Sequence, residues 1–90
     1  MNVVVTGARG FIGEELTRHC RDRDIDVLGI DSVPIDVPGY VAADIRSPDI
    51  DTAIPQGTDA LVHLAAISRD ADCRANPQLA YDVNILGTMN

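Results

Sequence analysis

Three glycines and an arginine near the N-terminus have types and spacing that suggest chemistry. Gly7, Gly10 and Gly13 follow a β-branched run, and Arg9 lies between the first two glycines. Gly7 lets the chain leave a strand sharply, Gly10 lets the backbone approach a pyrophosphate, and Gly13 lets a helix pack closely on a sheet. The free N–H groups at the start of that helix would face the anion. The spacing therefore predicts a phosphate-binding turn, and the alternative is a tight turn that holds no ligand.

Two carboxylates end later strand-like runs. Asp31 stands 24 residues after Gly7, close to the spacing of roughly 20 residues expected for a carboxylate that accepts the hydroxyls of an adenosine ribose. Asp44 and Ile45 end the next run, and a carboxylate beside an apolar residue can hold the edge and face of an adenine. The alternative for Asp31 is a solvated loop residue, and Asp44 and Ile45 are as readily explained without a ligand.

The run HLAAIS places small residues where the chain leaves a further strand. Ala65 and Ala66 would let a cofactor lie against the backbone. His63 lies inside the apolar run, and we interpret it as a strand residue rather than a catalytic group. Ile67, Ser68 and Arg69 are the candidates for the near edge of a substrate site, although a solvated loop explains Ser68 and Arg69 at least as well.

Strands and helices alternate along the chain, which indicates a parallel sheet with helices on both faces. Residues 32–39 contain two prolines and leave little room for a crossover helix, so we expect a loop there. Apolar spacing predicts which residues face inward on the first and last helices: Phe11, Ile12, Leu16, His19 and Cys20, and then Leu79, Val83, Leu86 and Asn90. The expected strands are 2–6, 25–31, 40–45 and 59–67, and the expected helices are about 10–22, 47–54 and 76–90. The prediction is one α/β domain over residues 1–90, a Rossmann-like doubly wound parallel sheet, incomplete at about four strands.

Composition excludes several classes of protein. The formal net charge of −7 disfavours nucleic acid and anionic membrane surfaces as partners. No apolar run approaches the roughly 20 residues that span a bilayer, and the N-terminus lacks the basic region of a signal peptide, so we expect a cytoplasmic protein. Cys20 and Cys73 form no C-x-x-C unit and have no histidine at ligand spacing, which predicts reduced thiols and no metal site.

Three segments together resemble the extended short-chain dehydrogenase/reductase family, the NAD-dependent sugar-nucleotide epimerases and dehydratases. TGARGFIG is similar to that family's glycine turn, VHLAA to its fourth-strand motif and VNILGT to a helix motif further along. The resemblance covers essentially the whole chain. It implies that the pyrophosphate site is formed by Gly7, Gly10, Phe11, Ile12 and Gly13. By the same resemblance Asp31 would contact the ribose, and Asp44 and Ile45 would contact the adenine. Leu64, Ala65 and Ala66 would form a wall running toward the nicotinamide, and Asn84 would be the asparagine behind the active site.

The resemblance leaves the choice between NAD and NADP to two residues. In related reductases an arginine at the position of Arg9 can pair with the 2′-phosphate of NADP. Asp31 accepts hydrogen bonds from two ribose hydroxyls but meets a 2′-phosphate as a like charge, which is costly. We therefore expect NAD rather than NADP, with Arg9 beside the cofactor. The alternative for Arg9 is a solvated side chain that pairs with a nearby acid.

The catalytic unit of that family is missing. It requires a Y-x-x-x-K sequence, in which the tyrosine is the acid/base and the lysine lowers its pKa. Here Asp44 and Ile85 stand four residues after Tyr40 and Tyr81, and the chain contains no lysine. The family resemblance implies an enzyme that exchanges hydride between a nucleotide sugar and NAD, of which this chain is an inactive N-terminal part without catalytic residues.

Two other functions remain open at this point. One is a non-catalytic dinucleotide-binding or NAD-sensing module, and the other is a structural or anion-binding α/β domain. The last strand would be an unpaired edge and the last helix partly uncovered, so we expect self-association into a homo-oligomer.

Overall fold

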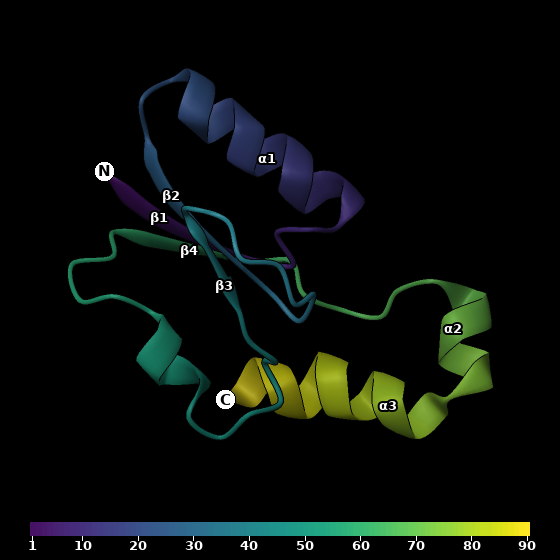
Figure 1. Cartoon of the computed structure of the whole chain (residues 1–90). Coiled ribbons are helices and arrows are strands. Elements are labelled where there is room, and N and C mark those ends of the chain that lie inside the picture. The colour runs from purple at the N-terminus through teal and green to yellow at the C-terminus, as the bar shows by residue number, and fades with distance from the viewer.

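The computed structural model describes the backbone of all 90 residues and every side chain except that of Asp70. Four short strands and one long helix form most of the regular secondary structure, and the remaining helical segments are shorter (Figure 1). In chain order the elements are β1 (Asn2–Thr6), α1 (Phe11–Asp22), β2 (Asp26–Asp31), β3 (Tyr40–Ala42), the 3₁₀ helix η1 (Ile50–Ala53), β4 (Ala60–His63), α2 (Asp70–Ala75), α3 (Pro77–Tyr81) and the π-helix η2 (Asp82–Gly87).

The sheet is parallel throughout and has the strand order β3-β2-β1-β4. Val4 of β1 pairs with Leu28 of β2 on one side and with Leu61 of β4 on the other. The order reverses between β1 and β4, and in doubly wound sheets ligands bind at this switch point, beyond the carboxyl ends of the strands. The fold class predicted from the sequence is therefore confirmed, and the position of a ligand site follows from the topology.

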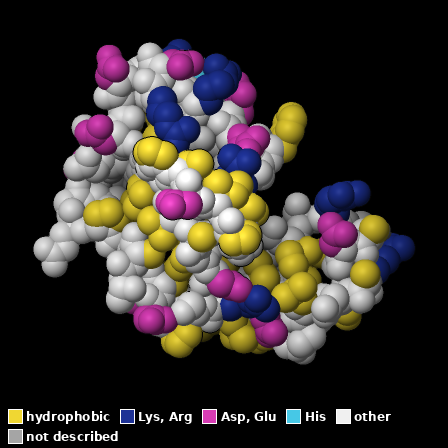
Figure 2. Space-filling model, viewed as in Figure 1, with side chains coloured by type: hydrophobic (Ala, Val, Ile, Leu, Met, Phe, Trp, Pro, Cys, Tyr) yellow, Lys and Arg dark blue, Asp and Glu magenta, His cyan; other side chains and the backbone are white. Residues whose placement is uncertain are grey.

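Alternate residues of the strands supply two packed layers. Val3 and Val5 are buried toward α1, while Val4 belongs to a core with Ile30, Ile45 and Ile50 on the opposite face. The α3–η2 segment and η1 lie on that opposite face (Figure 1). In the view of Figure 2, charged side chains of both signs are interspersed over α1, and hydrophobic side chains gather over the strands and α3.

β3 and β4 end before the expected residues 45 and 67, for a shared reason. The pairing of β4 ends at His63 because its partner Thr6 is the last residue of β1, and the pairing of β3 ends at Ala42 opposite Asp31. A strand can be paired only as far as its neighbour runs. Residues 32–39 form the expected loop without a helix.

The inward faces of the helices differ from the prediction. On α1 the buried residues are Gly13, Thr17 and Cys20, whereas Phe11 is 96 % exposed and Ile12 is 64 % exposed. Cys20 was predicted to face inward and is buried, but close contact between the helix and the sheet selects small residues, so apolar spacing identified this face only in part.

The C-terminal helix was expected as one continuous element, but it starts as α3 and continues as a π-helix. Within it Ala80 and Gly87 are buried, while Leu86 is half exposed. A Cβ on Gly87 would lie 2.8 Å from Ile45 Cδ1, so the absence of a side chain lets this helix approach Ile45. The short helix α2 was not predicted. It has six residues and no capping side chain among those described.

Candidate functional site

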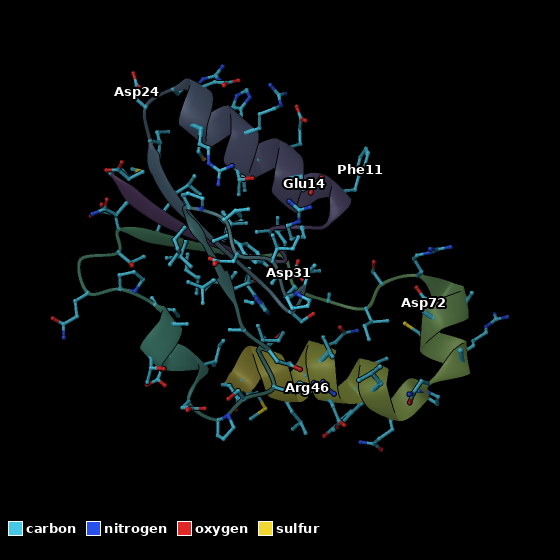
Figure 3. The ribbon with its side chains drawn as sticks, in the orientation of Figure 1. Phe11, Glu14, Asp24, Asp31, Arg46 and Asp72 are labelled. Atoms are coloured by element: carbon cyan, nitrogen blue, oxygen red, sulfur yellow. The ribbon has the colours of Figure 1, made fainter. Side chains whose placement is uncertain are left out.

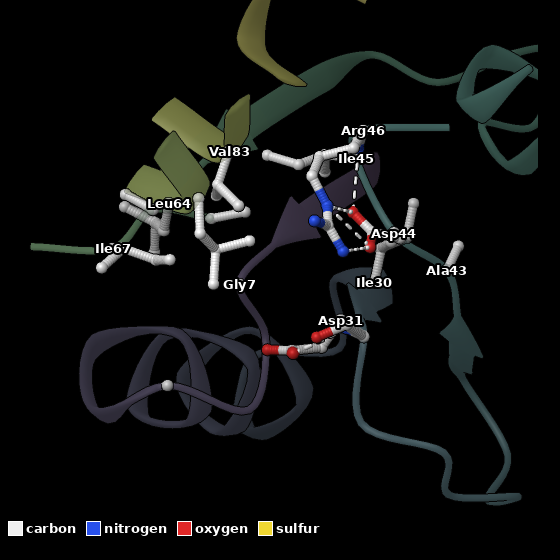
Figure 4. A pocket seen from close by; sticks show the side chains of 15 residues that line it. Gly7, Ile30, Asp31, Ala43, Asp44, Ile45, Arg46, Leu64, Ile67 and Val83 are labelled. Carbon is white, nitrogen blue, oxygen red and sulfur yellow. Dashed lines mark hydrogen bonds and ion pairs between the residues drawn. The ribbon is translucent and has the colours of Figure 1, made fainter. Parts of the chain in front are cut away.

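A pocket of about 310 Å³ lies at the carboxyl ends of β1, β2 and β4, at the switch point of the sheet (Figure 4). This volume is at the lower end of the range of roughly 300–1,000 Å³ that is usual for small-molecule sites. Segments far apart in the sequence form its walls: Gly7, Gly10, Ile30, Asp31, Ser32, Ala43, Asp44, Ile45, Arg46, Leu64, Ala65, Ala66, Ile67, Leu79 and Val83.

The glycine turn forms one wall of the pocket, and glycine is needed at its three positions for different reasons. Gly7 has φ +71°, and a Cβ there would lie 2.8 Å from the backbone N of Ala65. A Cβ on Gly13 would lie 2.1 Å from Gly7 O, so helix α1 can pack on the turn only with glycine there. A Cβ on Gly10 would meet only Gly7 O, at 3.3 Å. Packing alone therefore demands glycine at 7 and 13, while Gly10 leaves open backbone on the pocket side.

The first turn of α1 adds backbone donors to this wall. Its N-cap is Gly10, which has no capping side chain among those described. Glu14 N–H makes the first intrahelical bond, to Gly10 O at 2.9 Å, so the N–H groups before it have no intrahelical acceptor. Phe11 and Ile12 are exposed and lie outside the lining of the pocket, and Figure 3 shows Phe11 projecting outward from the start of α1. Any contact of these two residues with a ligand would be through their backbone N–H groups.

The Asp31 carboxylate is held at the end of β2 by two backbone donors. Arg9 N–H donates to Oδ2 at 2.9 Å and Ser32 N–H donates to Oδ1 at 2.7 Å. The Arg9 guanidinium lies 3.2 Å from Glu14 Oε1, on the side of α1. Burial, followed by the negative charge of Asp31, raises the pKa of the Tyr40 hydroxyl, which donates to Val33 O at 2.7 Å.

The Asp44 carboxylate is covered by the residue two places after it. Arg46 Nε lies 3.1 Å from Oδ1 and 3.0 Å from Oδ2, and Arg46 Nη2 lies 2.6 Å from Oδ2. Arg46 N–H also donates to Oδ1 at 2.9 Å. These hydrogen bonds hold the pKa of the Asp44 carboxyl below its usual value and raise that of Arg46. Figure 4 shows the guanidinium turned back onto Asp44 inside the pocket.

A hydrogen-bond relay fixes the wall formed by the end of β4. Thr6 Oγ1 accepts from Leu64 N–H at 3.1 Å and Ala65 N–H at 3.2 Å, and it lies 2.6 Å from His63 Nδ1. These two N–H groups leave the Thr6 proton for Nδ1, since a hydroxyl has two lone pairs and one proton. Thr88 Oγ1 donates its own proton to Asn84 O at 2.8 Å, so it accepts from His63 Nε2. We therefore assign His63 the tautomer with its proton on Nε2, which donates to Thr88 Oγ1 at 2.8 Å. His63 is thus a residue of β4 with both ring nitrogens hydrogen-bonded.

Asn84 holds the next part of the same wall from the side of η2. Its Oδ1 accepts from Ile67 N–H at 2.7 Å, and its Nδ2 donates to Ile67 O at 2.8 Å. The amide thus pairs with both backbone groups of one residue, as a neighbouring strand would. Ser68 and Arg69, which follow Ile67, are exposed.

The pocket brings together most of the residues that the sequence singled out. Gly7, Gly10, Asp31, Asp44, Ile45, Leu64, Ala65 and Ala66 line it, whereas Arg9, Phe11, Ile12, Gly13 and Asn84 lie outside its lining. Sequence reasoning missed Arg46, although a charged residue directly after the expected strand 40–45 was a usable signal. It also missed Leu79 and Val83, which it had placed on an inward helix face but not in a site.

Two further observations concern the described part of the chain. No helix there is both long and apolar enough to cross a membrane. No group of three or more metal-ligating side chains comes together within it, and Cys20 and Cys73 are free thiols.

Comparison with known proteins gives a family match over almost the whole chain. The model of the "NAD dependent epimerase/dehydratase family" matches residues 3–90. An uncharacterized epimerase/dehydratase of Staphylococcus aureus strain USA300 is 32 % identical over 109 residues, covering 98 % of this chain and 30 % of that protein.

Solved structures of other proteins are similar to this chain over almost its whole length. A UDP-glucose-4-epimerase from Stenotrophomonas maltophila, with bound NAD and formylated UDP-arabinopyranose, superposes with a TM-score of 0.84 at 28 % identity, covering 99 % of this chain and 31 % of that chain. An L-threonine dehydrogenase from Phytophthora infestans has a TM-score of 0.84 at 31 % identity, covering 99 % of this chain and 30 % of that chain. The chain therefore spans about a third or less of the length of these proteins.

Proposed function

The chain belongs to the NAD-dependent epimerase/dehydratase family, and we propose that it is the NAD-binding N-terminal portion of a sugar-nucleotide epimerase or dehydratase. The observation that carries the proposal is the pocket at the switch point, which joins the glycine turn to the Asp31 carboxylate. NAD would supply the hydride acceptor and donor of the intact enzyme. The residues of this chain would bind and orient it.

The glycine turn fits a pyrophosphate. Gly10 lines the pocket, and a Cβ at Gly10 would have no close neighbour except Gly7 O, so this glycine keeps the backbone accessible rather than satisfying a packing contact. The uncapped N–H groups at the start of α1 and the positive end of its dipole favour an anion at the same place. Phe11, Ile12 and Gly13 would contribute their backbone N–H groups.

The surroundings of Asp31 support NAD over NADP. Each carboxylate oxygen accepts one backbone N–H and retains a lone pair for a ribose hydroxyl. A 2′-phosphate would meet this carboxylate as a like charge. Arg9, which could have offset that charge, has its guanidinium beside Glu14 instead.

The far end of the pocket would hold the nicotinamide half. Leu64, Ala65 and Ala66 form this wall, and the Asn84 amide fixes the backbone that continues it. A sugar nucleotide is proposed as the substrate because a neighbour of known structure binds a UDP-sugar together with NAD. Without lysine and without a Y-x-x-x-K unit, the 90-residue chain by itself is proposed to bind cofactor but not to turn over substrate.

Calorimetric titration of the chain with NAD, NADP and ADP-ribose tests this proposal. We expect saturable binding of NAD and ADP-ribose, with NADP at least about tenfold weaker. Absence of NAD binding by the folded chain would contradict the function, and tighter NADP binding would contradict the role of Asp31. A Y-x-x-x-K unit encoded beyond Asn90 in the parent gene would favour the enzyme over an NAD-sensing module, the alternative that the missing lysine supports.

A further inference from the structure

Arg46 and Asp44 together present both kinds of hydrogen-bonding group to the pocket. The Asp44 carboxylate offers only acceptors, while the Arg46 guanidinium offers only donors. Arg46 uses Nε and Nη2 on the carboxylate, which leaves Nη1 and one hydrogen of Nη2 for another partner. Both side chains line the pocket beside Ile45, and both are partly exposed.

We propose that Arg46 sets the base specificity of the pocket, so that the Asp44–Arg46 pair accepts a purine with either a 6-amino or a 6-oxo group. This inference rests on the proposed function, and it takes Asp44 and Ile45 as the residues that contact the adenine of NAD, as the family resemblance implies. An amino group donates to a carboxylate oxygen, and an oxo group accepts from the guanidinium. In nucleic acid recognition arginine likewise donates to the 6-oxo group of guanine, and carboxylates accept from an exocyclic amino group, that of cytosine.

The surroundings of Arg46 allow it to give up part of its contact with Asp44. Asp82 of η2 lies near enough to add to the stabilisation of the charged guanidinium, so a second carboxylate is available when a base takes up an oxygen of Asp44. The side-chain exposed fractions of Arg46 and Asp44, 43 % and 38 %, indicate that water competes for the ion pair and that its rearrangement is not costly.

Without Arg46 the pocket would bind adenine in preference to a 6-oxo purine. A carboxylate with no donor beside it still accepts an adenine amino group, but it repels a 6-oxo group and leaves that oxygen without a partner. Specificity arises from such mismatches more than from the favourable contact itself. Removal of Arg46 is therefore expected to increase selectivity for adenine, even where it lowers affinity for every dinucleotide.

The test compares NAD with nicotinamide hypoxanthine dinucleotide, which carries a 6-oxo group, by calorimetric titration of the 90-residue chain. The unmodified chain is expected to bind the two within about threefold of each other. Arg46→Met, which keeps the length of the side chain but has no donor, is expected to prefer NAD by at least about tenfold. Arg46→Lys, which keeps a donor, is expected to restore the ratio of the unmodified chain.

Two controls separate this role from general effects. Arg18→Met removes an equally charged, ion-paired arginine from α1, outside the pocket, and is expected to leave the ratio unchanged. Asp44→Asn combined with Arg46→Met is expected to return the ratio to near one, because an amide can donate or accept. Circular dichroism and thermal melting establish that each variant is folded.

Each outcome decides one statement. A ratio in Arg46→Met within threefold of the unmodified chain, with NAD still bound, overturns the role of Arg46 and leaves the proposed function intact. A tenfold preference for NAD in the unmodified chain overturns it as well. Failure of the folded, unmodified chain to bind NAD overturns the proposed function and this inference with it.

Discussion

Replacement of Thr6 by valine tests how the pocket wall is held. Valine has nearly the same shape as threonine but no hydroxyl, and Thr6 is only 5 % exposed, so the change removes hydrogen bonds without creating a cavity. The hydroxyl accepts from Leu64 N–H and Ala65 N–H and donates to His63 Nδ1. Leu64 N–H also has Thr6 O as an acceptor, at 3.1 Å, so Ala65 N–H is the donor that valine leaves without its protein acceptor.

The magnitude follows from these partners. Loss of the bond and desolvation of the half-buried Ala65 N–H should together cost about 2 kcal/mol, whereas His63 is exposed and can bond to water instead. Thr6→Ser keeps the hydroxyl and loses one methyl group, which costs about 1 kcal/mol. For a domain of this size each kcal/mol lowers the melting temperature by about 4–8 °C. The valine variant should therefore melt about 4–8 °C below the serine variant.

Thermal melting and urea unfolding, both followed by circular dichroism, measure this difference. Nitrogen NMR of His63 is the second measurement, since the relay requires the proton on Nε2 in the unmodified chain and in Thr6→Ser. A valine variant that melts at or above the serine variant would refute the hydrogen-bonding argument. A proton on Nδ1 in the unmodified chain would refute the assignment of the donors.

Four other substitutions give three further predictions, with Gly57→Ala as the matched control for Gly7→Ala. Glu14→Gln should release Arg9 from its ion pair and improve NADP affinity by roughly fivefold with little effect on NAD, as measured by calorimetry. Gly7→Ala should lower the free energy of unfolding by more than about 2 kcal/mol, because it adds a backbone clash to a positive φ. Gly57→Ala, with a positive φ but no atom within 4 Å of its Cβ, should lose only about 1 kcal/mol in the same urea titration. The pKa of Asp44 is lowered in the folded chain, so its contribution to the free energy of unfolding is present above about pH 4 and is lost as the pH falls further. Because the side chain is partly exposed, this contribution is small. Asp44→Asn should therefore reduce the destabilisation of the chain by acid by less than about 1 kcal/mol.

The order and type of the main elements could be read from the sequence because each signal was local. The β-branched run of β1, the glycines after it and Pro77 near the start of α3 act through the chain that immediately adjoins them. Strand ends could not be read in this way. The end of β4 depends on where β1 turns away, and that neighbour lies about 60 residues earlier in the chain.

The composition of the site was predictable where motif and topology agreed. Gly7 follows β1, Asp31 ends β2 and Ala65 lies beyond β4, and a parallel sheet brings the carboxyl ends of its strands to one edge. Arg46 was missed because its importance lies in a contact with a neighbour rather than in a periodic pattern. The outward position of Phe11 was missed because small residues, which carry no hydrophobic signal, form the contact of α1 with the sheet.

The wall after β4 shows why site and fold cannot be separated in so small a domain. After the bond from Leu64 N–H to Thr6 O, this backbone passes the pocket beyond the end of its ladder with β1. Thr6, near the start of the chain, accepts a hydrogen bond from Ala65 N–H. Asn84, near the end, accepts from Ile67 N–H and donates to Ile67 O. Side-chain hydrogen bonds thus hold this backbone in place of strand pairing, and His63 is hydrogen-bonded to both Thr6 and Thr88. A change in either terminal segment should therefore reach the pocket through the position of this wall, even though neither Thr6 nor Asn84 lines it.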